Sequence, residues 1–225
     1  MICLLHINTA LGRAMVAISR DNERLAYREN AVQKDHSSFL QPAIRDLLND
    51  TGMSLKDMDA VTVINGPGSY TGLRVGLSAA KGICFSLQKP MINLSTLDWM
   101  AMPFKGTDET YICPLIDARR MEVFTATYDR NLNYITSPEA LILGEQSFGE
   151  ILDKGGVIFT GDGADKLPGI ITGHPNARVW DNRSSVNEQI LMGEMAYNRA
   201  EFADIAYCEP FYLKAFYTPE TDKKR

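Results

Sequence analysis

The sequence predicts an α/β protein of two small lobes, because one order of strands and helices occurs twice along its 225 residues. Each copy begins with three strands joined by short connections, which indicates an antiparallel meander. Each copy then continues as helix, strand, helix and strand, which indicates parallel strands joined by crossover helices. A chain of this length can bury a core without disulfide bonds or metal ions.

The first copy has clear signals for every element. Its opening segments are apolar or alternate between apolar and polar residues, and turn-forming residues separate them. Apolar side chains then recur at helical spacing, and a later β-branched run indicates a strand buried on both faces. We predict strands at 2–7, 14–18, 25–32, 60–64 and 91–94, and helices at 36–48 and 72–87.

The second copy repeats the order with weaker signals. Its last helix opens with a capping box formed by Ser185 and Glu188. We predict strands at 111–116, 122–128, near 134, at 157–160 and near 179, and helical segments at 146–152, after 164 and at 186–203.

This duplicated order is that of the ribonuclease H-like fold. Two such lobes in one chain make the architecture of the actin and sugar-kinase (ASKHA) superfamily. We expect the first lobe to span 1–98 and a reduced second lobe to span 99–225. The segment from about 204 is expected to pack back on the first lobe.

Composition and charge exclude several classes of protein. The chain has 23 basic and 28 acidic residues and a net charge of −5, so it lacks the field that attracts nucleic acid by itself. No apolar run is long enough to cross a bilayer, and the first residues lack the pattern of a signal peptide. Four scattered cysteines fit buried free thiols. We therefore expect a cytoplasmic protein with no membrane segment.

The stretch from Gly66 to Gly76, Gly-Pro-Gly-Ser-Tyr-Thr-Gly-Leu-Arg-Val-Gly, is the most informative motif. It leads from a strand through glycines into a helix, where free backbone N–H groups can bind anions. No lysine follows Gly72, so the motif does not match the common phosphate-binding loop. It is either a nucleotide loop or a tight turn in which Ser69 or Thr71 caps the helix, and the missing lysine favours the turn.

The helix after this motif carries two rows of apolar or small residues. One row includes Leu77 and is expected to face the sheet of its own lobe. The other row holds Gly72, Gly76 and Ala79, which either pack inside the lobe or let another helix approach closely. We predict that Gly76 lies at a helix–helix contact between chains, beside the helix at 36–48.

Residues suited to catalysis are sparse. Asn8 follows the first strand, and its neutral amide cannot replace a carboxylate as a magnesium ligand, which disfavours phosphoryl transfer. Asp117 ends the matching strand of the second lobe and is either a metal carboxylate or the cap of its turn. The residue four after His36 is Leu40, so no histidine pair shares a helical face. Ser69 lacks the glycine frame of a nucleophile elbow. We predict neither a metal site nor a catalytic set.

These stretches resemble the bacterial TsaB (YeaZ) family. The resemblance rests on residues 66–76, on His-Ser-Ser at 36–38, on Ile-Asp-Ala-Arg-Arg-Met-Glu-Val at 116–123 and on Pro-Phe-Tyr-Leu-Lys at 210–214. Where the family usually has Asp-Thr-Ser after the first strand, this chain has Asn-Thr-Ala at 8–10. That departure counts against nucleotide chemistry at this loop.

The resemblance implies a non-catalytic dimerisation subunit of the tRNA threonylcarbamoyladenosine machinery, with no cofactor of its own. It implies that the helices at 36–48 and 72–87 dock on the catalytic TsaD subunit, which modifies the adenosine beside the anticodon. It also implies an ATPase partner, TsaE, contact with tRNA only through the complex, and a homodimer when the chain is alone. The alternatives are a sugar- or acetate-kinase-like phosphotransferase and a glycoprotease-like peptidase. Asn8 and the missing histidine pair count against both.

Two groups of residues are therefore candidates for function. The candidate partner interface consists of His36, Phe39, Leu40, Ala43, Tyr70, Gly72, Val75, Gly76, Ala79 and Ile83. The candidate remnants of phosphate or nucleotide loops are Asn8, Thr9, Asp117, Gly161, Asp162 and Gly163.

Overall fold

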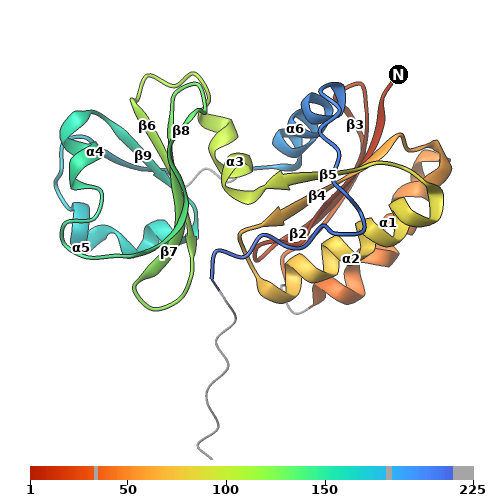
Figure 1. The fold of residues 1–225 in the computed structure, drawn as a ribbon, viewed down its shortest axis with the longest axis horizontal. Coiled ribbons are helices and arrows are strands. Elements are labelled where there is room, and N and C mark those ends of the chain that lie inside the picture. The colour runs from red at the N-terminus through yellow and green to blue at the C-terminus, as the bar shows by residue number, and fades with distance from the viewer. Residues whose placement is uncertain (33–34, 181–183, 215–225) are drawn as a thin grey trace, which may run out of the picture.

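Two five-stranded sheets with helices packed against them make up the two halves of the molecule (Figure 1). The structure is a computed structural model that describes residues 1–32, 35–180 and 184–214. Residues 215–225, at the end of the expected second lobe, lie outside the described residues.

The first sheet is built around its first strand. Its members are β1 (Cys3–Asn8), β2 (Ala14–Arg20), β3 (Glu23–Asn30), β4 (Ala60–Gly66) and β5 (Met91–Ser95). They lie in the order β3-β2-β1-β4-β5, with β2 antiparallel to β1 and β3, and with β4 parallel to β1 and β5. Every residue of β1 and β4 is buried, as expected for strands covered by helices on both faces.

Helices α1 (His36–Thr51) and α2 (Tyr70–Leu87) pack on one face of this sheet. Leu40 and Leu47 of α1 join Leu77 and Cys84 of α2 in a buried cluster with the strands. A short 3-10 helix, η2 (Leu55–Asp57), precedes β4. The helical spacing in the sequence therefore predicted the inward rows of both long helices.

The second sheet has the same topology. Its strands are β6 (Tyr111–Asp117), β7 (Glu122–Asp129), β8 (Tyr134–Ile142), β9 (Val157–Thr160) and β10 (Ala177–Trp180). Its helical segments are α4 (Gly149–Lys154), η4 (Asp162–Lys166) and α5 (Pro168–Ile171). The strands lie in the order β10-β9-β6-β7-β8. This is the order of the first sheet, read from its other edge, if β6 to β10 are matched in turn with β1 to β5. The predicted duplicated α/β architecture is confirmed.

The last helix, α6 (Val186–Asn198), packs on the first sheet, on the face opposite α1 and α2 (Figure 1). Its capping box is present, because Ser185 N and Oγ both donate to Glu188 Oε2 at 2.7 Å. A Cβ at Gly193 would lie 2.8 Å from Thr62 Cγ2 and 3.1 Å from His6 Cε1. The expectation that this helix completes the second lobe was wrong. Because Gly193 has no side chain, α6 can lie directly against the first sheet.

A buried polar network lies beneath α6. His6 is fully buried, with Nδ1 2.8 Å from Thr62 Oγ1 and Nε2 2.7 Å from Ser19 Oγ. Gln189 Nε2 donates to Ile7 O at 3.1 Å and to Thr62 Oγ1 at 3.3 Å. Burial lowers the pKa of the His6 imidazole to about 3, so this side chain is neutral at pH 7.

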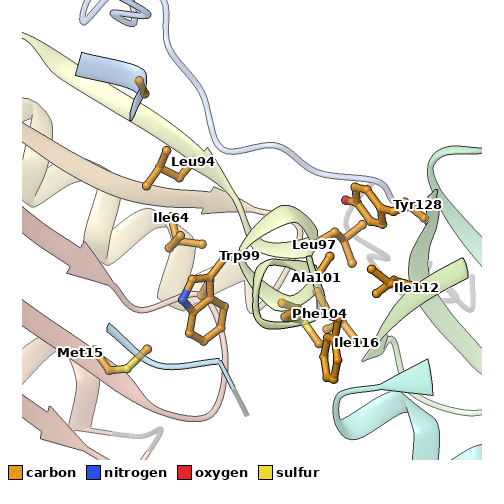
Figure 2. Packing of buried hydrophobic residues seen from close by; sticks show 14 of the residues in the cluster. Met15, Ile64, Leu94, Leu97, Trp99, Ala101, Phe104, Ile112, Ile116 and Tyr128 are labelled. Atoms are coloured by element: carbon orange, nitrogen blue, oxygen red, sulfur yellow. The ribbon is translucent and has the colours of Figure 1, made fainter. Parts of the chain in front are cut away.

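A short helix between the sheets, α3 (Thr96–Ala101), continues as a 3-10 helix, η3 (Met102–Phe104). Figure 2 shows Trp99 on the side of Ile64, in the first lobe, and Leu97 on the side of Tyr128, in the second. Phe104 extends this cluster into the second lobe. Both lobes therefore share one hydrophobic cluster around the connecting helix.

The chain after α6 crosses the first lobe without regular secondary structure and approaches the second sheet (Figure 1). Ala203 N donates to Met91 O at 2.8 Å, and Phe211 N donates to Asn65 O at 2.8 Å. At its described end, Lys214 Nζ donates to Glu122 Oε2 in the second lobe at 2.5 Å. This C-terminal segment, residues 199–214, therefore contacts both lobes.

The cysteines are all free thiols. Cys3, Cys84 and Cys113 are buried, which confirms that part of the prediction, whereas Cys208 is only half-buried. Within the described ranges, no helix combines the length and apolar character that crossing a bilayer requires.

Candidate functional site

The motif at residues 66–76 forms the end of β4, a turn and the first turns of α2, and it packs against the loop after β1. Ser69 caps the helix, since its Oγ accepts from Gly72 N at 3.3 Å. Ser69 N donates to Ala10 O at 2.7 Å, and Thr9 Oγ1 donates to Gly72 O at 2.6 Å. The motif therefore joins a capped turn to the neighbouring loop, as the missing lysine predicted.

The glycines of this motif permit that close approach. A Cβ at Gly68 would overlap Ala10 O, and a Cβ at Gly72 would overlap Thr9 O. A Cβ at Gly76 would overlap Thr9 Oγ1 and lie 3.5 Å from Ile7 Cγ2. Gly72 and Gly76 thus lie against their own β1 and the following loop. Gly76 was placed at a contact between chains because its missing side chain could let another helix approach. That reason was wrong, because β1 and the loop after it already fill the space beside Gly76.

The other candidate interface residues divide into a buried and a half-buried group. Leu40, Ala43 and Ile83 point into the lobe. Phe39 and Val75 are half-buried at the edge of the same cluster, and so is Ala79. Only the half-buried group offers side-chain surface on the outer side of α1 and α2.

His36 begins α1 and is buried beside the loop after β1. Burial lowers the pKa of its imidazole, while the carbonyls of Thr9 and Gly12 and the charge of Asp35 partly oppose that effect. Leu40, one turn further along, is also buried. The His36 side chain therefore packs α1 against the loop after β1.

Tyr70 is covered by the C-terminal segment. Its ring stacks on Tyr212 with centroids 5.0 Å apart, and the Arg74 guanidinium lies 4.0 Å from its ring centroid. Arg74 Nε also donates to Tyr212 Oη at 2.9 Å. The sequence signal for this contact was the Pro-Phe-Tyr-Leu-Lys stretch, whose partner could not be read from local spacing.

The loop after β1 holds its polar residues inward. Asn8 Oδ1 accepts from Ala10 N at 3.1 Å, and both Asn8 and Thr9 are buried. Asn8 Nδ2 has no hydrogen-bond partner among the described residues. The amide therefore closes an Asx turn.

The matching loops of the second lobe are also held by internal contacts. Asp117 Oδ1 accepts from Lys166 Nζ and from Arg119 N, each at 2.5 Å, while Asp162 Oδ1 accepts from Asp117 N at 3.0 Å. Partial burial raises the pKa of Asp117, but Lys166 and the Arg119 N–H outweigh it, so the pKa lies below its usual value. Asp117 thus caps its turn, the alternative that the sequence left open. Gly161 (φ 104°) lies next to this contact.

Gly163 is buried against the strands of the second sheet. A Cβ there would lie 3.0 Å from Leu115 Cβ and 3.0 Å from Val123 Cγ1. This glycine therefore allows η4 to approach β6 and β7.

A cavity of about 230 Å³ lies between the lobes. It is lined by Leu11, Gly12, Arg13, Met15, Trp99, Met100, Thr160, Gly161, Asp162, Asp165 and Ser184. The cavity brings together the two loops that the sequence singled out, but neither Asn8 nor Asp117 lines it. The charged residues of this lining are two carboxylates, Asp162 and Asp165, and one guanidinium, Arg13, which pairs with Glu29. This charge disfavours the polyphosphate of a nucleotide. In the described part of the chain, no group of three potential metal ligands is assembled.

Comparison with known proteins identifies the family. A family model described as TsaD, tRNA N6-adenosine threonylcarbamoyltransferase, matches residues 29–157, more than half of the chain. TsaB proteins of Bacillus subtilis and Escherichia coli, described as acting in tRNA threonylcarbamoyladenosine biosynthesis, are each 36% identical, over 125 and 133 residues. This chain belongs to the TsaB (YeaZ) family. The matches cover 56% and 59% of this chain, and 54% and 57% of those relatives, so the chain aligns with little more than half of their length.

Solved structures agree on the fold. YeaZ from Pseudomonas aeruginosa is 24% identical, with a TM-score of 0.79 over 95% of this chain and 100% of that one. A Bacteroides thetaiotaomicron protein described as having an actin-like ATPase fold is 7% identical, with a TM-score of 0.50 over 85% of this chain and 95% of that one. The TsaB-family chain therefore has the ASKHA-type architecture that the element order predicts.

Proposed function

We propose that the chain is a non-catalytic subunit in tRNA threonylcarbamoyladenosine biosynthesis and acts by binding a TsaD-type catalytic subunit in the cytoplasm. The observation that supports the role in this pathway is the match of residues 29–157 to the TsaD family model, together with the TsaB names of the relatives. A TsaE-type ATPase joins this complex, and tRNA is reached through the complex.

The non-catalytic role is supported by the way in which the polar side chains of both loops are used. The Asn8 amide closes its own turn, and the Asp117 carboxylate is paired with Lys166. Acid–base or metal chemistry would need these groups to face a substrate. In this proposal the loop after β1 fixes the position of α1 and α2.

The outer side of α1 and α2 is the proposed docking face. Phe39, Val75 and Ala79 are half-buried there, and Ser78 and Gly82 are exposed on α2. Small side chains let two helix axes come closer together. In the isolated protein, the same face pairs with a second copy of the chain.

The proposal is tested by reconstitution with the TsaD-type and TsaE-type subunits from the same organism. An unmodified tRNA transcript is incubated with threonylcarbamoyl-adenylate, and the modified nucleoside is measured by mass spectrometry. We expect product from the complete mixture, none from this chain alone, and a large loss when this chain is omitted. Product from this chain alone would contradict the non-catalytic role. Full activity without it would contradict the role in the pathway.

A further inference from the structure

The C-terminal segment lies along α2 and runs in the opposite direction to the helix. Ile205 lines an open groove together with residues 84–90, at the end of α2. Further along the segment, Cys208 O accepts from Lys81 Nζ at 3.0 Å. Tyr212 then reaches the first turn of the helix. The segment therefore follows one flank of α2 from its end to its beginning (Figure 1).

This segment is held by hydrogen bonds more than by buried side chains. None of its described residues, 199–214, is buried, and none belongs to a helix or strand. Its half-buried side chains only border the clusters of the first lobe. Segments with few buried apolar contacts open at a free energy below that of global unfolding. We therefore expect the C-terminal segment to detach while both lobes stay folded.

The far end of the segment reaches the beginning of the proposed docking face. Arg74, Ser78 and Gly82 are exposed and follow one another at intervals of four residues, so they lie along one side of α2. Ser78 and Gly82 are small and leave room for a partner helix. Arg74 is instead held by its hydrogen bond to Tyr212 Oη and by the Tyr70 ring. A helix that lay close to α2 along this whole side would therefore meet Tyr212 at the first turns.

We propose that the C-terminal segment is an autoinhibitory strap that must leave the first turns of α2 before the TsaD-type subunit docks there. The inference rests on the proposed function and adds a control of the same docking face. The apparent affinity of a protein that binds only in its open form is lowered in proportion to the open fraction. Weakening the contacts of the segment should therefore tighten binding of the TsaD-type subunit.

Hydrogen exchange in the isolated protein measures the opening of the segment. The amides of Phe211 and Val61 are both hydrogen-bonded, to Asn65 O and to Pro90 O, but Val61 belongs to the buried strand β4. We expect the Phe211 amide to exchange at least about a hundredfold faster than the Val61 amide, at a rate that low concentrations of urea leave unchanged. Exchange of both amides at one rate, through global unfolding alone, would overturn the inference.

Three variants of the segment connect its opening to binding. Tyr212→Ala removes the aromatic stack and the hydrogen bond with Arg74, which should raise the open fraction about tenfold. We expect about tenfold faster exchange at Phe211, unchanged exchange at Val61, and up to about tenfold tighter binding of the TsaD-type subunit by isothermal titration calorimetry. Tyr212→Phe keeps the stack and should change exchange and affinity less. Tyr207→Ala is the matched control, because Tyr207 lies in the same segment with its side chain 85% exposed, and it should change neither quantity.

Exchange in the complex shows where the segment lies once the partner is bound. We expect the Phe211 amide to exchange faster in the complex with the TsaD-type subunit than in the isolated protein, because the segment stays open. Slower exchange there, or weaker binding by Tyr212→Ala, would overturn the inference, because the segment would then be part of the docking surface. Equal affinities of Tyr212→Ala and the wild type would overturn it as well. In each of these cases normal binding by the wild type leaves the proposed function standing, whereas failure of the wild type to bind would overturn both.

Discussion

Two glycines of α2 should respond in opposite ways to the same substitution. Alanine in place of glycine inside a helix stabilises it by about 1 kcal/mol, because the unfolded chain loses conformational freedom. Gly82 is exposed, and a Cβ there would have nothing within 4 Å. Gly82→Ala should therefore stabilise the protein by about 1 kcal/mol.

At Gly76 the same gain is opposed by a steric clash. The new Cβ overlaps Thr9 Oγ1, and that hydroxyl is held by its hydrogen bond to Gly72 O. Overpacking of this kind costs about 1–3 kcal/mol. We therefore expect Gly76→Ala to be less stable than Gly82→Ala by about 1–3 kcal/mol, or roughly 2–12 °C in melting temperature.

Urea unfolding followed by circular dichroism measures the difference, with the slope m expected to stay unchanged. Adding Thr9→Ala to Gly76→Ala removes the clashing oxygen, so it should restore part of the lost stability. Adding Thr9→Ala to Gly82→Ala should bring no gain in stability. Equal stabilisation by both alanine substitutions would refute the assignment of Gly76 to an intramolecular contact.

Three further predictions concern His6, the cysteines and the cap of α6. The pKa of His6, about 3 in the folded protein, lies below its unfolded value of about 6.5, so protons bind preferentially to the unfolded chain between these values. Urea unfolding should therefore show stability falling from about pH 6.5 towards pH 3, by up to about 1.4 kcal/mol per pH unit from this residue. Ellman's reagent should label Cys208 first in the native protein, because burial raises the pKa of Cys113 to about 12 and that of Cys84 to about 11. Ser185→Ala should cost about 1 kcal/mol by thermal unfolding, because it removes the cap of α6.

Local patterns in the sequence predicted most of the elements and their order. Alternation and helical spacing are properties of neighbouring residues, so β1, β4 and the inward row of α2 could be recognised without a structure. The turn role of residues 66–76 could also be recognised, because the stretch lacks the lysine of the common phosphate-binding loop.

Contacts between distant segments could not be predicted in the same way. The row with Gly72 and Gly76 lies beside a second apolar row, and spacing alone cannot decide which row meets the loop after β1. The packing of α6 on the first sheet depends on the fit of Gly193 against His6, and these two residues lie far apart in the chain. The C-terminal segment is held by backbone hydrogen bonds and the Tyr70–Tyr212 stack, and it has no periodicity to detect.

The docking face of α2 is tested most directly by measuring affinity for the TsaD-type subunit with two variants at Gly82. This residue is exposed beside Ala79, so either substitution should leave the fold intact. We predict that isothermal titration calorimetry shows near wild-type affinity for Gly82→Ala and at least about tenfold weaker binding for Gly82→Arg, because the long cationic side chain separates the helices. Equal affinities for Gly82→Arg and Gly82→Ala would contradict the proposed docking face and would mean that the TsaD-type subunit binds another surface.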